Sequence, residues 1–139
     1  MTKEKIIAQL NKHRPAFLNA LGCTIMDVDT EKSTCTMEFN ITKDYCHSGN
    51  IIQGGFVTAM LDAVTSHAVF AMNPAIQVLS TLELKVSFYK ASHDGKLKAI
   101  GRIDKMGRSI AFLSGDLYNE DNVRTASITS TAKVFIPKS

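Results

Sequence analysis

An acidic residue, Asp62, interrupts the longest apolar stretch of the sequence, residues 56–72. Burying a carboxylate without partners is strongly unfavourable, so an acid inside an apolar helix needs either compensating hydrogen bonds or a function. Thr58 and Ser66 lie four residues to either side, where a helix could bring them onto the same face as Asp62. Two interpretations stay open at this point: a satisfied structural carboxylate, or a general base or nucleophile in a cleft.

Two glycines, Gly54 and Gly55, open the same predicted helix. Glycine lets a ligand approach the backbone closely, and the first turn of a helix carries N–H groups without intrahelical acceptors. Together with the helix dipole, these N–H groups stabilise negative charge, as the oxyanion of an acyl transfer requires. A glycine pair needed only for tight packing would give the same pattern.

The three cysteines, Cys23, Cys35 and Cys46, are odd in number and show no metal-ligand spacing. They predict reduced thiols in a cytoplasmic protein and no metal site. Cys46 is followed by His47, but neighbours in an extended segment point in opposite directions, which disfavours a nucleophile and base pair.

The composition is that of one ordinary folded domain, residues 1–139, with 45% hydrophobic and 21% charged residues. The net charge of +3 comes from scattered lysines and arginines, which disfavours nucleic-acid binding and suits an anionic small molecule. Residues 1–21 have no apolar signal core, and polar residues interrupt residues 56–72. We therefore expect neither a secretory leader nor membrane association.

The elements that must position Asp62 follow from the periodicity. Residues 3–21 have helical spacing, with Thr2 as the N-cap, a break at Pro15 and a C-cap position at Gly22. Residues 24–29 and 33–41 alternate between polar and apolar positions and predict a hairpin, whereas residues 42–53 are irregular. Residues 56–72 predict a helix that is apolar on nearly every face and must be wrapped by other elements.

Four further stretches have strand-like composition and are separated by short turn-forming clusters. They cover residues 77–90, 96–104, 109–118 and 123–135. Connections this short favour an antiparallel meander. The sequence therefore predicts an α+β fold, with a curved antiparallel sheet of about six strands wrapped around one long central helix.

These residues resemble the hotdog-fold thioesterases of the phenylacetate-degradation type over roughly residues 15–136. That family carries a His-Gly-Gly motif before an acid on the central helix. Here Gln53-Gly54-Gly55 occupies the motif, and Asp62 stands at the position of the acid. Residues 79–89 are similar to the first long strand after the helix, and residues 105–108 to a family turn.

The resemblance implies a role for each matching residue. Gly54 N–H would polarise the thioester carbonyl, and Asp62 would activate water or attack directly. Thr81 would position the water and would come from the partner subunit. Lys90 and Arg108 would contact the phosphates of coenzyme A, although either could be a solvated surface charge.

The neighbours of the motif are expected to bind substrate, namely Gln53, Gly55 and Phe56, with an apolar acyl slot lined by Phe56, Val57 and Met60. Gln53 replaces the family His and can form hydrogen bonds but cannot carry a proton. The family also carries an Asn six residues before its His, and this position falls on His47 here. Asn50 could take the role of that Asn through a shifted loop.

An Asp-x4-His string, Asp62 to His67, is also similar to a pair in hotdog hydratases, where the pair precedes the central helix. Here both residues lie within the predicted helix, about 140° apart round its axis, so they do not converge on one substrate. We interpret His67 as a packed or interface histidine.

The sequence thus predicts hydrolysis of an acyl-CoA thioester without a metal or cofactor. In the family the sheets of two chains join into one continuous surface, so we expect a dimer or a homotetramer made of two dimers. Two alternatives are a non-catalytic domain that binds acyl-CoA or fatty acid, and a thioesterase acting on acyl carrier protein.

Overall fold

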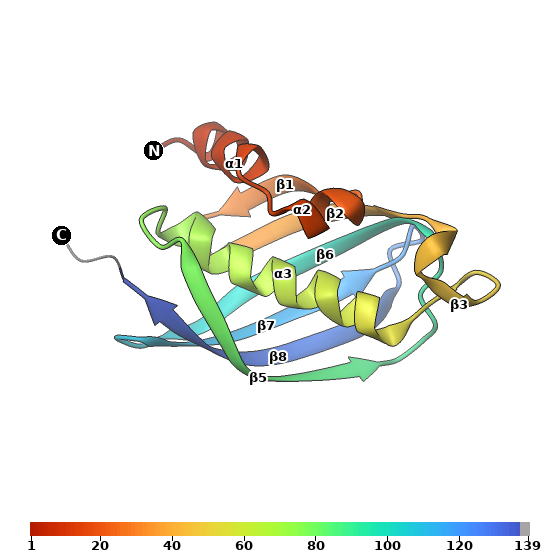
Figure 1. Cartoon of the computed structure of the whole chain (residues 1–139). Coiled ribbons are helices and arrows are strands. Elements are labelled where there is room, and N and C mark those ends of the chain that lie inside the picture. Colours follow the sequence, from red (N-terminus) through yellow and green to blue (C-terminus); the bar gives the residue numbers. More distant parts are fainter. Residues whose placement is uncertain (137–139) are drawn as a thin grey trace.

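One long helix lies across the concave face of a curved antiparallel sheet in the computed structural model, which describes residues 1–136 (Figure 1). The predicted α+β architecture is confirmed. The helices are α1 (Lys3–Lys12), α2 (Ala16–Ala20) and α3 (Gly54–Met72), with a short 3-10 helix η1 (Lys43–Tyr45). The strands of the main sheet are β1 (Thr24–Asp29), β2 (Thr34–Ile41), β5 (Val78–Phe88), β6 (Gly95–Met106), β7 (Ile110–Tyr118) and β8 (Arg124–Phe135).

The N-terminal segment has the predicted boundaries. The Thr2 hydroxyl accepts a hydrogen bond from Lys5 N–H at 3.2 Å and caps α1. Pro15 separates α1 from α2, and Gly22 follows α2 with a φ of +63°, a left-handed conformation that favours glycine. Local sequence signals therefore fix this region.

The central helix α3 packs directly on β6, in the middle of the sheet. A Cβ atom on Gly101 of β6 would lie 2.4 Å from the Val64 carbonyl oxygen, so only glycine permits this close approach. Within the described chain, α3 is the one helix long and apolar enough to cross a membrane, but 56% of its apolar window is buried by the sheet and its neighbours. It is the buried central helix that its composition predicts.

The predicted meander is wrong for one strand. Strands β6, β7 and β8 do form a meander, but the sheet order is β1-β2-β6-β7-β8-β5, so β5 pairs with β8 and not with β6. The reason is that β6 already pairs with β2 on one side and β7 on the other. β5 therefore joins the sheet at an edge, beside β8.

Residues 42–53 contain more structure than predicted. Strands β3 (Cys46–Ser48) and β4 (Ile51–Ile52) form a small separate hairpin. Ile52 N–H donates to the Ser92 carbonyl at 2.8 Å, and Gln53 N–H donates to the Tyr45 carbonyl at 2.9 Å. These bonds fix the point at which α3 begins.

The strand β5 forms one edge of the main sheet, and its outer backbone groups have no strand partner among residues 1–136. Its large apolar side chains are unusually exposed: Val78 by 58%, Leu82 by 58% and Phe88 by 54%. A bulge lies between Thr81 and Glu83 and shifts the alternation of side chains along the strand. A long, apolar, unpaired edge of this kind is suited to pairing with another chain.

Candidate active site

The Asp62 carboxylate lies half-buried on α3 and has one side-chain partner. Thr81 Oγ1 on β5 donates to Asp62 Oδ1 at 2.9 Å. The other carboxylate oxygen accepts no hydrogen bond from any residue between 1 and 136. The acid is therefore held in one orientation but retains a free oxygen that could take a proton.

The origin of Thr81 differs from the prediction. The resemblance implies that the partner subunit supplies this hydroxyl, whereas Thr81 and Asp62 of the same chain form the bond. The reason is the position of β5, whose first half runs beside α3 and directs Thr81 toward the helix. One chain thus holds the acid and its positioning hydroxyl together.

The helical neighbours of Asp62 do not bind its carboxylate. Thr58 Oγ1 donates to the Gly54 carbonyl at 2.9 Å, and Ser66 Oγ donates to the Asp62 main-chain carbonyl at 2.9 Å. Both hydroxyls thus return to the backbone four residues earlier, a common arrangement for Ser and Thr within helices. This leaves Thr81 as the polar side chain that fixes the acid.

The first turn of α3 presents one free amide. Gln53 is the N-cap, and its Oε1 accepts from Gly55 N–H at 2.8 Å. Gly54 N–H has no acceptor within the described part of the chain. A Cβ on Gly54 would lie 3.4 Å from the Phe88 ring, so the glycine leaves a small open space beside the end of β5. Gly54 is therefore the first-turn donor best placed for a carbonyl oxygen.

The predicted polar residues His47 and Asn50 lie close to this turn, on the β3–β4 hairpin that leads into α3. Both are exposed, and His47 Nδ1 lies 2.7 Å from Ser48 Oγ. The Asn50 carbonyl accepts from His93 Nδ1 at 3.1 Å. The structure thus brings His47, Asn50, Gln53 and Gly54 to one end of the sheet.

The amide and the acid are far apart within a single chain. Gly54 and Asp62 are separated by eight residues of continuous helix, which corresponds to about 12 Å along the axis. An oxyanion donor must lie about 3 Å from the oxygen that it stabilises. One substrate carbonyl cannot be served by both groups of the same chain.

The residues predicted to line an acyl slot are mostly in the core. Val57 and Met60 are 2% and 0% exposed, so that part of the prediction is wrong: an α3 wrapped by the sheet buries this face. Phe56 stays 37% exposed, and its ring contacts Tyr45 edge-on at a centroid distance of 4.8 Å.

The two predicted phosphate contacts lie at opposite ends of the sheet. Lys90 is exposed just after β5, near the start of α3, where its N–H donates to the Thr125 carbonyl at 3.2 Å. Arg108 is exposed in the turn between β6 and β7, at the end of the sheet where α3 finishes (Figure 1). A single chain does not bring them to one ligand.

The cysteines show no sign of a nucleophile. Burial raises the pKa of the Cys23 thiol to about 11 and that of Cys35 to about 12. Cys46 pairs with Ile52 in the small hairpin, and the adjacent His47 contacts Ser48 instead. Between residues 1 and 136, no three His, Cys, Asp or Glu side chains gather as a group that could hold a metal ion.

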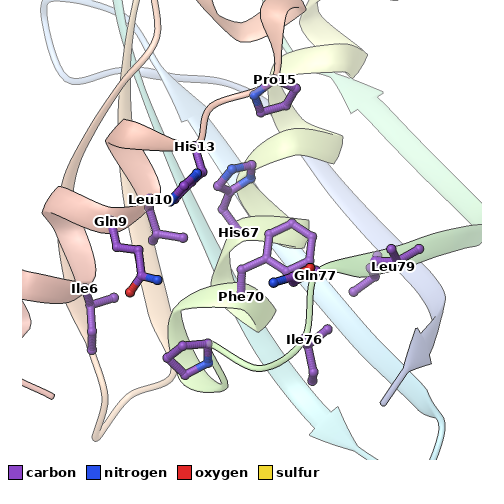
Figure 2. Close-up of a pocket in the computed structure, with 12 residues that line it drawn as sticks. Ile6, Gln9, Leu10, His13, Pro15, His67, Phe70, Ile76, Gln77 and Leu79 are labelled. Carbon is purple, nitrogen blue, oxygen red and sulfur yellow. The ribbon is translucent and has the colours of Figure 1, made fainter. Parts of the chain in front are cut away.

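One cavity of the structure was not predicted from the sequence. It has a volume of about 590 Å³ and lies beside the C-terminal half of α3, with His67 in its wall (Figure 2). His67 is 6% exposed and its Nδ1 lies 2.9 Å from the Ala63 carbonyl oxygen. The helical geometry predicts that His67 and Asp62 point in different directions, and no hydrogen bond joins their side chains in the described part of the chain. The cavity itself depends on how α1 packs against α3, which no local pattern reveals.

Comparison with known proteins identifies the family. Residues 49–126 match the model of the Thioesterase superfamily. A candidate esterase of Thermoplasma volcanium is 29% identical over 91 residues, which cover 66% of this chain and 66% of that protein.

Solved structures agree. A candidate thioesterase related to phenylacetic acid degradation, from Ralstonia eutropha, is 29% identical with a TM-score of 0.83, covering 93% of this chain and 99% of that one. A hypothetical thioesterase from Streptococcus pneumoniae, solved with coenzyme A, is 17% identical with a TM-score of 0.74, covering 84% of this chain and 88% of that one. The first bears out the expected resemblance; the second shows the shared fold.

Proposed function

The chain belongs to the thioesterase superfamily, and on that premise we propose that it hydrolyses acyl-coenzyme A thioesters to the free acid and coenzyme A. The observation that carries the proposal is the Asp62 carboxylate, which is held by Thr81 at 2.9 Å and whose second oxygen accepts no hydrogen bond from the described residues. Coenzyme A in the Streptococcus pneumoniae relative supports that choice of carrier.

We propose that two chains complete each active site. Gly54 and Asp62 lie about 12 Å apart along one helix, a distance that excludes a complete site within one chain. Strand β5 has an apolar edge that is unpaired among residues 1–136. Antiparallel pairing of two copies of β5 about a two-fold axis sets the Thr81 half of one strand beside the Phe88 half of the other. Since the Phe88 ring adjoins Gly54, this pairing moves the partner's amide toward the acid.

In this scheme the thioester carbonyl accepts a hydrogen bond from Gly54 N–H of one chain. Asp62 of the other chain removes a proton from a water oriented with the help of Thr81, and the water oxygen attacks the carbonyl carbon. The tetrahedral oxyanion then collapses, the C–S bond breaks, and the thiolate of coenzyme A takes up a proton. Direct attack by Asp62, followed by hydrolysis of the anhydride, uses the same groups.

The carrier would lie at the end of the sheet where α3 begins. Lys90 is an exposed cation there, and His47, Asn50 and Gln53 supply polar groups beside Gly54. The net charge of +3 suits the anionic phosphates of coenzyme A. The scheme uses no metal, and we propose a cytoplasmic enzyme that is a dimer or a dimer of dimers.

The test is the substitution Asp62→Asn, which keeps an acceptor for Thr81 but removes the base. We expect kcat to fall about 10²- to 10⁴-fold, the usual contribution of a positioned base. Free-thiol release from short, medium, long and aromatic acyl-CoAs measures it. Asp104→Asn is the matched control, because Ser114 Oγ donates to Asp104 Oδ1 at 2.9 Å in a similar pair on the outer face of the sheet.

Unchanged turnover in Asp62→Asn would exclude Asp62 as the catalytic acid. Binding of acyl-CoA without thiol release by the wild type would replace hydrolysis with a binding function. Faster release from acyl carrier protein than from coenzyme A, with one acyl chain on both, would change the assigned carrier.

A further inference from the structure

The two edges of the main sheet differ in what lies beside them. The sheet order places β1 at one edge and β5 at the other, so each strand has a side that faces no further strand of residues 1–136. An exposed edge of this kind can pair with another chain. At β1, however, the helix α1 of the same chain packs against the strand (Figure 1). The edge of β1 is therefore covered, whereas the edge of β5 carries exposed apolar side chains.

The side chain of Asn11, near the end of α1, takes the place of a neighbouring strand. Asn11 Nδ2 donates to the Ile25 carbonyl at 3.0 Å, and Asn11 Oδ1 accepts from Ile25 N–H at 2.9 Å. In an antiparallel sheet, the facing residue of a hydrogen-bonded pair makes the same two bonds with its own backbone. One side-chain amide thus satisfies both the N–H and the C=O of Ile25.

Arg14 fixes the orientation of this amide. Its Nη1 donates to Asn11 Oδ1 at 2.6 Å, and its Nε donates to Asn19 Oδ1 at 2.9 Å. A guanidinium group can only donate, so the oxygen of the Asn11 amide must face Arg14. The same oxygen accepts from Ile25 N–H, which leaves the amide nitrogen for the Ile25 carbonyl. The contact between α1 and β1 therefore has one defined geometry.

The rest of α1 is attached less firmly. Ile6 is the one side chain of this helix that is buried. Lys3 Nζ lies 3.1 Å from Asp27 Oδ1, but both side chains are about half exposed, and ion pairs of this kind contribute little. A bulge between Ile25 and Asp27 also distorts the edge, as bulges on edge strands do. Asn11 is thus the principal polar contact that holds α1 against β1.

We infer, on the basis of the proposed pairing of two chains through β5, that Asn11 holds α1 over β1 and closes this edge to a second copy of the chain. With one edge closed, pairing through β5 uses up the only open edge of each chain, and the continuous sheet ends there. With both edges open, each chain would pair twice, and the sheet would extend from chain to chain without closure. Asn11 therefore limits assembly to the edge that completes the active site.

The experiment compares Asn11→Ala with Asn19→Ala, a matched control that removes the other bond of Arg14. Light scattering measures the molar mass over a range of protein concentrations. We expect the mass of the wild type and of Asn19→Ala to level off, and that of Asn11→Ala to keep rising with concentration. Thiol release per chain should be unchanged, because the site lies at the other edge. A mass of Asn11→Ala equal to that of the wild type at every concentration would overturn the inference.

A second substitution distinguishes pairing through β1 from aggregation of unfolded chains. Met26 is the extra residue of the bulge in β1 and is 50% exposed. A lysine on an edge strand opposes pairing with another strand. Adding Met26→Lys to Asn11→Ala should therefore return the mass to that of the wild type. Continued growth of the double variant contradicts the inference, since the growth would then not come from the edge of β1.

Hydrogen exchange of the Ile25 amide tests the closed edge in the wild-type protein, and so covers the case in which Asn11→Ala does not fold. We expect slow exchange in the wild type and exchange about 10- to 100-fold faster in Asn11→Ala, which lacks both bonds to Ile25. Exchange in the wild type at the rate of an exposed amide would mean that α1 leaves the edge open. A monomeric wild type without thiol release would instead refute the proposed two-chain site, and Asn11→Ala should then form pairs through β1.

Discussion

The two halves of α3 differ in whether a single chain forms the whole feature that lies beside them. In the first half, the Gly54 amide and the Asp62 carboxylate lie about 12 Å apart along the helix axis. Each has a hydrogen-bonding atom without a partner among residues 1–136. In the second half, residues of α1, α3 and the start of β5 of the same chain line a partly open cavity of about 590 Å³. One half presents reactive groups, and the other presents a shaped space.

The two halves of α3 therefore depend on different contacts. If two chains supply the reacting groups, catalysis depends on association through β5, whereas the shape of the cavity at His67 depends on the packing of α1 within each chain. Substitutions in the first half should therefore change kcat and respond to the oligomeric state.

Among the tests of this comparison, the substitution Gly54→Pro is expected to have the largest effect on kcat. Proline fits the first position of a helix, and Gln53 before it is already extended, with φ −62° and ψ 136°. The fold should survive, because the lost N–H has no acceptor within the described chain. Loss of one oxyanion donor typically lowers kcat by about 10²- to 10³-fold. Thiol release measures the effect, and Gly54→Ala, which keeps the N–H, is the control.

Mixing chains then tests whether the halves come from different protomers. Chains with Gly54→Pro and chains with Asp62→Asn are each inactive alone, but a mixed dimer contains one site with both wild-type groups. Random mixing would restore about a quarter of the wild-type activity, since half of the dimers are mixed and each has one complete site. No recovery in a mixture shown to exchange subunits would place both groups within one chain.

The sequence was sufficient for the groups whose environment is local. Asp62 stands out because burying an acid in an apolar helix is unfavourable without hydrogen-bond partners or a function. The glycines before it mark a helix start with free amides. The caps at Thr2 and Gly22 and the break at Pro15 follow from backbone chemistry within a few residues.

What the sequence could not show depends on tertiary packing. Strand β6 has both neighbours already, which excludes it as the partner of β5, and the place of β5 beside β8 brings Thr81 to Asp62 of its own chain. Val57 and Met60 fall in the core because the sheet wraps that side of α3. The cavity at His67 arises only where α1 meets α3, elements more than 40 residues apart.

A smaller decrease in kcat is expected from a substitution at Thr81, the residue that binds Asp62. Thr81→Val keeps the shape of the side chain but removes the hydroxyl that donates to Asp62 Oδ1. A hydrogen bond to a charged group contributes about 1.5–3 kcal/mol, so we expect kcat to fall about 10- to 100-fold with KM nearly unchanged. Thr81→Ser should restore most of the loss, whereas Thr129→Val, on the exposed face of β8, should have no effect. A change in KM alone would make Thr81 a binding residue and not a positioning one.

The smallest expected effect concerns stability in the second half of α3. Burial lowers the pKa of His67 below its usual value of 6.5, against the opposing hydrogen bond to Ala63, so the unfolded chain binds a proton more readily than the folded one. Stability is then greatest above pH 6.5 and falls as the pH drops through 6.5 toward the lowered pKa of the folded state, where the loss ends. Urea denaturation between pH 7.5 and 5 measures the slope. His67→Asn should flatten it, although His13 also lines the cavity; an unaltered slope would mean that His67 is not the group that titrates.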